Sequence, residues 1–269
     1  MADRLDLSEF ARHELRIDEV RAMFRRNKGV VGWVDGMFVC RSDDMIALRF
    51  LNGHGYESVT RELWKRSCRG AEIVVDVGTH SGVFTLDAYR AGAKFVISCE
   101  PHPINYARMV LNLRYNNFRS DGACFGAIGD ENKVETFNVA EMHKVHAAGC
   151  VGGKATLQIP VHVVRLDSLI ARESWPKIGA VKIDAENYTP KVLAGMSGIL
   201  AEHRPDLFIE CTESGMGDVL KALGYRFWRI WETGNVEEVD DLVPHNPDNN
   251  YNGTHEDCRN RFASVKGLP

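Results

Sequence analysis

From Glu72 onwards, short apolar runs alternate with segments of helical pattern, and this alternation constrains the fold more than any other feature. Strands are predicted at 73–77, 95–99, 123–128, 135–139, 158–164, 180–184, 207–211, 225–231 and 262–265. Helices are predicted at 83–91, 103–117, 166–171, 190–200 and 216–223. Strands separated by helices pair in parallel through right-handed crossovers. The sequence therefore predicts an α/β fold with a doubly wound sheet between two helical layers.

The residues before this region lack the alternation. A helix is predicted within residues 1–30, and Asp35-Gly36 between two β-prone stretches predicts a hairpin. A second helix is predicted at 59–68. We expect a helical and hairpin appendage over residues 1–70 and one main domain over residues 71–269. The appendage could shield a site or form the contact of a homo-oligomer.

The composition narrows the classes of partner. The chain has 33 Lys and Arg against 37 Asp and Glu, a net charge of −4. Because phosphate-rich ligands need a basic surface, this balance argues against nucleic acid and anionic membranes as partners. No run of about 18 apolar residues is present. The seven cysteines include no Cys-x-x-Cys pair, and charges stand where a signal peptide would be apolar, so we expect a cytoplasmic protein with reduced thiols.

The polar residues at predicted strand ends indicate a ligand site. In open α/β sheets, ligands bind outside the carboxyl ends of the strands. The first strand runs into Asp76-Val-Gly78-Thr-His80-Ser-Gly82, where glycines would let the backbone approach a ligand. Glu100 ends the second strand and is suitably placed to accept hydrogen bonds from a ribose diol. The alternative is an ordinary strand-to-helix turn with a solvated glutamate.

The glycine spacing distinguishes between two kinds of nucleotide ligand, a dinucleotide and S-adenosylmethionine. A dinucleotide fold requires Gly-x-Gly-x-x-Gly so that a helix terminus can meet a pyrophosphate. The spacing in this chain is Asp-x-Gly-x-x-x-Gly, with Asp76 ahead of the first glycine. An anion at this position would repel a pyrophosphate but suits a ligand with a cationic end. S-adenosylmethionine (SAM) is such a ligand, and an NAD-dependent dehydrogenase is correspondingly disfavoured.

Several motifs occur in an order that resembles a known family. They are Val75-Asp76-Val-Gly78-Thr-His-Ser-Gly82, Glu100-Pro-His-Pro103, Ala127-Ile-Gly-Asp130, Leu166-Asp-Ser-Leu169, Lys182-Ile-Asp184-Ala-Glu186 and Phe208-Ile-Glu210, with Gly55-Tyr56-Glu57 ahead of them. Together they resemble the FkbM-like family of class I SAM-dependent methyltransferases. The resemblance implies a Rossmann-like fold with a mostly parallel seven-stranded sheet and an antiparallel last strand. It also implies O-methylation of a small molecule or sugar.

The resemblance implies roles for individual residues. The cofactor-binding residues would be Glu57, Asp76, Gly78, Thr79, His80, Ser81, Gly82, Glu100, Pro101, His102, Ala127 and Ile128. Asp184 and Glu186 would face the reacting methyl group. They could act as a base, as anions facing the sulfonium or, together with Glu210, as ligands of Mg²⁺.

Two departures from the family pattern bear on the substrate. His80 stands where the family commonly has asparagine, and Asp184-Ala-Glu186 continues as Asn187-Tyr188 without the usual glycine and second acid. Asn187, Tyr188 and His245 are candidate substrate contacts. The acceptor is expected to be a small molecule or carbohydrate. A non-catalytic SAM-binding module and a small-molecule N-methyltransferase remain alternatives, whereas the Pro-Pro-aromatic motif of nucleic-acid amino methylation is absent.

Overall fold

The computed structural model describes residues 31–34, 37–40, 44, 46, 56–139, 157–169, 176–210, 215–242 and 259–269. The helix predicted within residues 1–30 and the candidate His245 lie outside these ranges. The predicted hairpin is present as β1 (Val31–Val34) and β2 (Met37–Cys40), which pair antiparallel. The domain boundary expected at residue 70 stays a prediction.

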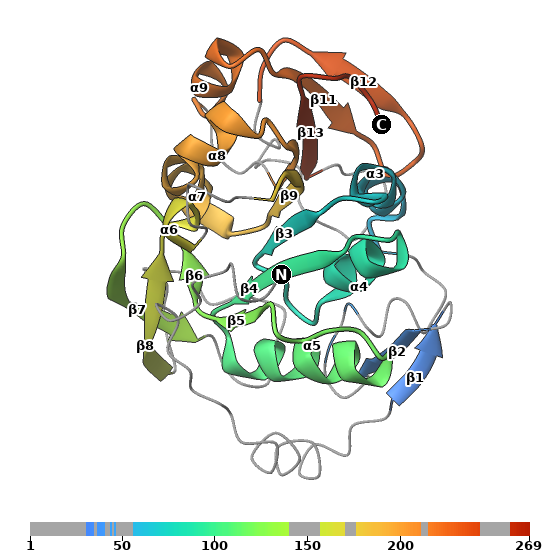
Figure 1. Ribbon diagram of the computed structural model, residues 1–269, viewed down its shortest axis with the longest axis vertical. Helices are drawn as coiled ribbons and strands as arrows, with labels where there is room; N and C mark the ends of the chain where they lie inside the picture. Colours follow the sequence, from blue (N-terminus) through green and yellow to red (C-terminus); the bar gives the residue numbers. More distant parts are fainter. Residues whose placement is uncertain are drawn as a thin grey trace.

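The central sheet has eight strands (Figure 1). Their order is β12 (Val236–Val239), β11 (Arg226–Ile230), β13 (Asn260–Ser264), β10 (Asp206–Glu210), β9 (Ile178–Ile183), β3 (Ile73–Val77), β4 (Phe95–Glu100) and β5 (Ala123–Phe125). The strands from β10 to β5 pair in parallel. The late strand β13 lies antiparallel between β10 and β11. The predicted α/β fold, with a mostly parallel sheet and an antiparallel last strand, is confirmed.

The eighth strand, β12, was not expected from the sequence. It pairs antiparallel with β11 and extends the edge of the sheet. None of its four residues is buried, and the exposed Glu238 forms an ion pair with Arg226 of β11. A strand without a buried face carries no alternation of apolar and polar residues, so the sequence pattern gave no signal for it.

Helices cover both faces of the sheet (Figure 1). On one face, α3 (Ser58–Cys68) and α4 (Val83–Arg90) pack on a core that includes Trp64 and Phe208. Next to α4 lies α5 (Pro103–Tyr115), which begins with proline, a residue tolerated in a first helical turn. On the other face lie α6 (Leu166–Leu169), α7 (Thr189–Gly195), α8 (Ser197–Glu202) and α9 (Gly217–Ala222).

The strand predicted at 123–128 is divided between two sheets. Its first part is β5, whereas Ala127–Ile128 forms β6 in a separate sheet of order β6-β8-β7, with β7 at Lys133–Val139 and β8 at Leu157–Val164. The break falls at Gly126, whose N–H donates to the carbonyl of Glu100. Beyond it, the N–H of Gly129 donates to the carbonyl of Val164, which directs the chain towards β8.

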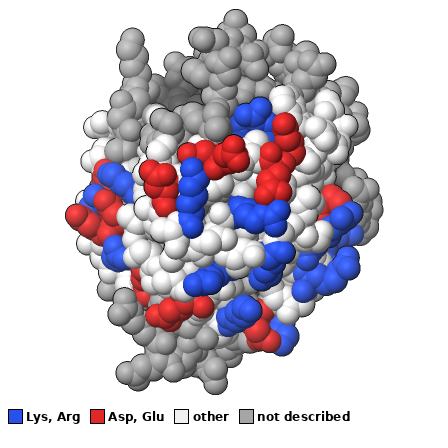
Figure 2. All heavy atoms as spheres, turned by 90° about the horizontal axis from the view of Figure 1, so that it is seen from above, with Lys and Arg blue, Asp and Glu red and all other residues white. Residues whose placement is uncertain are grey.

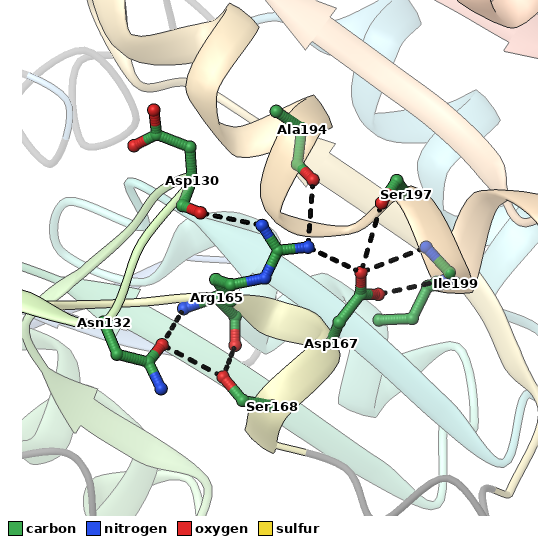
Figure 3. Close-up of polar contacts among 9 residues, drawn as sticks. Asp130, Asn132, Arg165, Asp167, Ser168, Ala194, Ser197 and Ile199 are labelled. Atoms are coloured by element: carbon green, nitrogen blue, oxygen red, sulfur yellow. Dashed lines mark hydrogen bonds and ion pairs between the residues drawn. The ribbon is translucent and has the colours of Figure 1, made fainter.

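The helix predicted at 190–200 is broken at Met196 into α7 and α8. A buried carboxylate explains the new start: Asp167 accepts hydrogen bonds from the N–H groups of Gly198 and Ile199, both at 3.0 Å (Figure 3). Arg165 donates to the same carboxylate at 3.2 Å and to the carbonyl of Ala194 at 3.3 Å. The Leu166-Asp-Ser-Leu169 motif therefore holds the α7–α8 break in place.

The substitution Asp167→Ala should lower the free energy of unfolding by about 2 kcal/mol, because it leaves the first N–H groups of α8 without an acceptor. The measurement is urea denaturation. Asp121→Ala is the control, because Asp121 pairs with Arg119 at an exposed position and its loss should cost less than about 1 kcal/mol. Equal effects of the two substitutions would contradict the capping role.

Candidate functional site

The turn after β3 is built around a close backbone approach. Gly78 has φ +76°, and a Cβ at this position would lie 1.8 Å from the carbonyl oxygen of Asp184. The N–H of Gly78 donates to the carbonyl of Cys99 at 2.9 Å, and the N–H of Asp184 donates to that of Val77, also at 2.9 Å. The glycine is thus required because the segments that leave β3 and β9 touch, and its contact with a cofactor stays a prediction.

The second glycine of the turn closes it against α5. Gly82 has φ +87°, and a Cβ there would lie 2.9 Å from the side chain of Met109. Thr79 is buried, and its hydroxyl lies 3.0 Å from the sulfur of Met109. Ser81 is also buried, and its carbonyl accepts a hydrogen bond from Asn112. Packing against α5 therefore accounts for the conformation of these three turn residues.

The carboxylate of Glu100 joins the turns that follow β3 and β4. One oxygen accepts the N–H of His80 and the other that of His102, both at 2.8 Å. His80 reaches this position with φ +53°, which is uncommon for a residue other than glycine. Burial raises the pKa of Glu100 to about 7, against the opposing effects of His80 and of the two N–H groups. Each oxygen keeps a lone pair, so the carboxylate can still accept two ligand hydroxyls.

The other residues expected around an adenosine lie near Glu100. Pro101 and His102 follow it directly, and burial lowers the pKa of His102 to about 4, so its ring is neutral near pH 7. Ala127 is partly exposed and Ile128 is buried, both in β6, just beyond the Gly126 N–H that binds the Glu100 carbonyl. The structure thus places both predicted pairs at one edge of the sheet.

Asp76 lies fully buried beneath the first turn. Its Oδ2 accepts a hydrogen bond from the Thr85 hydroxyl at 2.7 Å, and this hydroxyl lies 2.9 Å from that of Ser98. Burial raises the pKa of Asp76 to about 6, although Lys182 and Thr85 lower it. Within the described part of the chain, its Oδ1 has no hydrogen-bond partner. A buried acceptor oxygen without a donor suits a ligand that brings a donor or a positive charge.

At the end of β9, the buried Lys182 forms an ion pair with Asp184, whose side chain is partly exposed. The ammonium lies 2.9 Å from the Asp184 carboxylate and 4.4 Å from the centre of the Phe84 ring. Burial opposes both charges. It is outweighed at Lys182, whose pKa is raised by Asp184, Glu57 and Asp76. At Asp184, burial is outweighed by the Lys182 charge and by hydrogen bonds, which lower the pKa to about 2. Asp184 is therefore an anion at any physiological pH.

Strand register brings further polar residues to this edge. Ile183 of β9 pairs with Ile209 of β10, so Asp184 lies beside Glu210, which itself pairs with Asn260 of β13. Asn260 donates to the Glu57 carboxylate at 2.8 Å, and Arg259 contacts Glu210 at 3.2 Å. Glu57, expected to bind the cofactor, thus lies in one row with Asp184 and Glu210.

The sequence motifs include Lys182 but predict no role for it, and they do not include Asn260. A signal for Lys182 was present, because it is a charged residue within the apolar run 180–183. A buried lysine requires a partner, so it indicates acidic side chains nearby. No pattern along the sequence could identify Asn260, because its importance comes from pairing with a strand 50 residues earlier.

The segment after Asp184 forms a short 3₁₀ helix, Glu186–Tyr188. The structure describes no side chain for Glu186, so its catalytic role stays a prediction. Asn187 is exposed. The Tyr188 hydroxyl donates to Glu135 of β7 at 2.6 Å, and its ring lies under the Lys191 ammonium. These contacts show that Tyr188 packs against its neighbours, and its role as a substrate contact stays a prediction.

Most of the α/β domain matches a known protein family. The model of the methyltransferase FkbM domain matches residues 76–227, which is more than half of the chain. The chain belongs to the FkbM methyltransferase family. No curated protein matches it. The resemblance inferred from the motifs is thereby confirmed.

Solved structures with a similar arrangement are distant in sequence from this FkbM-family chain. An FkbM methyltransferase from Methylobacillus flagellatus KT is 18% identical with a TM-score of 0.44, over 72% of this chain and 44% of that one. This chain thus spans less than half the length of that protein. TYW2 from M. jannaschii in complex with AdoMet is 12% identical with a TM-score of 0.42, over 88% and 84% of the chains. TYW2 from P. horikoshii in complex with MeSAdo is 12% identical with a TM-score of 0.41, over 89% and 72%.

Two of the three carboxylates predicted as possible ligands of Mg²⁺, Asp184 and Glu210, have side chains that the structure describes. Each carboxylate is already paired with a cation, Lys182 and Arg259 respectively. Across the residues that the structure describes, no three potential metal ligands are grouped. The structure describes no side chain for Glu186, the third candidate ligand, so binding of Mg²⁺ stays a prediction.

The absence of nucleic-acid and membrane partners stays a prediction. Basic and acidic side chains are interspersed on the face that Figure 2 presents. Arg226 with Glu238 and Lys221 with Asp241 are exposed examples of such opposite charges in contact. Among the helices that the structure describes, none combines the length and apolarity needed to cross a bilayer.

The substitution Gly78→Ala should lower the free energy of unfolding by about 3 kcal/mol, because the methyl group would overlap the Asp184 carbonyl and force the β3 and β9 turns apart. Urea denaturation measures it. Gly224→Ala is the matched control: Gly224 also has positive φ but no atom within 4 Å of its Cβ, so conformational strain alone should cost about 1 kcal/mol. If both variants lose the same amount, the close approach is not what requires Gly78.

Proposed function

We propose that this chain is a SAM-dependent methyltransferase that methylates a hydroxyl group of a small molecule or carbohydrate. The observation that carries the proposal is the Glu100 carboxylate, which is fixed between the N–H groups of His80 and His102 at the carboxyl ends of β3 and β4. Two lone pairs remain for the vicinal hydroxyls of a ribose. Family membership supplies methyl transfer as the reaction class.

The charges of the site suit a cofactor with a sulfonium group. Asp76, Asp184 and Glu57 surround the single ammonium of Lys182, so the described side chains there carry more negative than positive charge. The unpartnered Oδ1 of Asp76 adds an acceptor below the turn. Bound SAM would supply a methyl group on a positively charged sulfur, which is already an activated leaving group. The chain's own task is then to place the acceptor oxygen in line and to receive its proton.

Asp184 is suited to one of the three roles considered for it. With a pKa of about 2, its carboxylate is a weak base, and its ion pair with Lys182 disfavours metal binding. A permanent negative charge at the end of β9 remains, and it would stabilise a cationic methyl donor. We therefore assign Asp184 the role of an anion that faces the sulfonium.

The affinity for SAM should depend on pH through Glu100. Its ionised form accepts both ribose hydroxyls, so the affinity should rise with pH up to about 7 and then level off. Asp76, with a pKa of about 6, should add to the loss below that pH. Calorimetric titration with SAM between pH 5.5 and 8.5 measures this dependence.

Two variants test the assignment of that pH dependence. Glu100→Gln should bind SAM at least about tenfold more weakly at pH 8 and lose most of the rise with pH. Glu72→Gln is the control. Glu72 is half exposed beside Lys94 and directly precedes β3, so it lies at the amino ends of the parallel strands, away from the site. Wild-type affinity in Glu100→Gln would remove the main support for the cofactor site.

The reaction itself is tested by transfer of a tritiated methyl group from SAM to methyl glycosides, nucleotide sugars, phenols and macrolides, with amines for comparison. Label is expected on hydroxyl oxygen. Asp184→Asn should reduce turnover about 100-fold while SAM affinity changes less than about threefold, because the lost charge acts mainly in the transition state. Label on amines alone would establish an N-methyltransferase, and SAM binding without any transfer would favour a non-catalytic module.

A further inference from the structure

Glu57 has a strained backbone conformation and lies near the carboxyl ends of the parallel strands. It precedes α3 with φ +45°, and its carbonyl accepts the N–H of Arg61 at 2.8 Å. This conformation lets its side chain reach Asn260, the first residue of β13, which pairs with Glu210 at the end of β10. Strain at a non-glycine residue persists where the surrounding structure enforces it, and such positions cluster at functional sites.

Glu100 is assigned to the ribose hydroxyls by the proposed function, and the other described carboxylates at this edge are poorly suited to receive a proton. Asp76 is completely buried under the first turn. Asp184 is bound to Lys182 and has a pKa of about 2. Glu210 is almost completely buried and paired with Arg259. The Lys182 charge lowers the basicity of Asp184, because the charge pair favours its ionised form.

Glu57 is held by neutral groups instead. Its carboxylate accepts from the Asn260 amide at 2.8 Å and is hydrogen-bonded by the Tyr56 hydroxyl. The side chain is partly exposed, and it forms no ion pair with another described residue. It is therefore oriented and reachable, while neither of its hydrogen-bond donors carries a charge.

The charges facing Glu57 come from three directions. Burial raises its pKa; Lys182 of β9 opposes this, whereas Asp184 and, from beyond β11, Glu232 add to it. The net result is a pKa above the usual value for a glutamate, which makes the carboxylate a stronger base. Proton transfer is most efficient when the pKa of the base is near the working pH.

Asn260 provides a second, independent observation. It is only 3% exposed, and within the described residues its Oδ1 has no hydrogen-bond partner. An unsatisfied buried acceptor is costly, so a ligand that brings a donor would be favoured there. An acceptor molecule with a second hydroxyl group next to the reacting one could supply that donor.

We propose that Glu57 is the general base of the methyl transfer and that Asn260 positions it. The acceptor hydroxyl gives its proton to the Glu57 carboxylate as its oxygen bonds to the methyl carbon. The carbon–sulfur bond breaks, its electron pair stays on sulfur, and S-adenosylhomocysteine and the methyl ether leave. The inference rests on the proposed function and gives Glu57 an acceptor-side role in place of the expected cofactor contact.

The first test needs no acceptor. Sinefungin carries an amine-bearing carbon in place of the methylsulfonium, so its ammonium should contact the base, whereas S-adenosylhomocysteine has no group there. By calorimetry at pH 7, Glu57→Gln should weaken sinefungin about tenfold and S-adenosylhomocysteine less than about twofold. Glu62→Gln is the matched control, because Glu62 is an exposed glutamate on α3, the helix that begins directly after Glu57. It should change neither affinity.

The second test follows the proton. At saturating SAM, with the hydroxyl compound that is methylated fastest, the wild-type pH profile of kcat/KM for that acceptor should have an acid limb. Glu57→Gln should abolish that limb and lower kcat about 100-fold. Asn260→Ala removes a hydrogen bond to the ionised carboxylate, so the limb should move to higher pH while S-adenosylhomocysteine still binds. This variant also tests the inference if Glu57→Gln does not fold.

The outcomes separate the two proposals. Failure of the wild-type chain to bind S-adenosylhomocysteine would overturn the proposed function. Binding of that ligand together with an unchanged sinefungin affinity in Glu57→Gln, or an unchanged acid limb in both variants, would overturn the role of Glu57 alone. Equal weakening of both ligands in Glu57→Gln would show a cofactor contact instead.

Discussion

The site depends on the attraction between the buried ammonium of Lys182 and the carboxylates around it. Asp184 contacts it directly, and Asp76 and Glu57 lie within its electrostatic influence. Without this cation, the carboxylates brought together by β3, β9 and α3 would repel one another and become protonated. The Phe84 ring beneath the ammonium replaces part of its lost hydration. One lysine thus permits a cluster of acids where parallel strands end.

The second constraint is the contact between the β3 and β9 turns. Gly78 allows the Asp184 carbonyl to approach its Cα, and the N–H groups of Gly78 and Asp184 bind neighbouring strand ends. The turn thought to hold the cofactor and the strand end thought to hold the acceptor are therefore one rigid unit. Such rigidity is what in-line transfer between two bound molecules requires.

The carboxylates of the site differ because their partners differ. A cation holds Asp184, backbone N–H groups hold Glu100, and a neutral amide and hydroxyl hold Glu57. The first carboxylate has a lowered pKa, whereas burial raises that of the other two. Three carboxylates can therefore have three different roles. Asp184 serves as a fixed anion, Glu100 as an acceptor of hydrogen bonds from the ribose hydroxyls, and Glu57 as a base.

The sequence by itself determined the α/β class, most strands and helices of the main domain, and the family, because buried strands and amphipathic helices leave periodic patterns and the motifs keep their order. It did not predict β12, which has no buried face, or the division of the third strand at Gly126, which depends on a hydrogen bond to Glu100. Tertiary structure alone decided that Glu57 meets Asn260, 203 residues away. The contact depends on α3 packing against β9 and β10 and on β13 pairing with β10, and contacts between segments far apart in the chain leave no periodic pattern in either one.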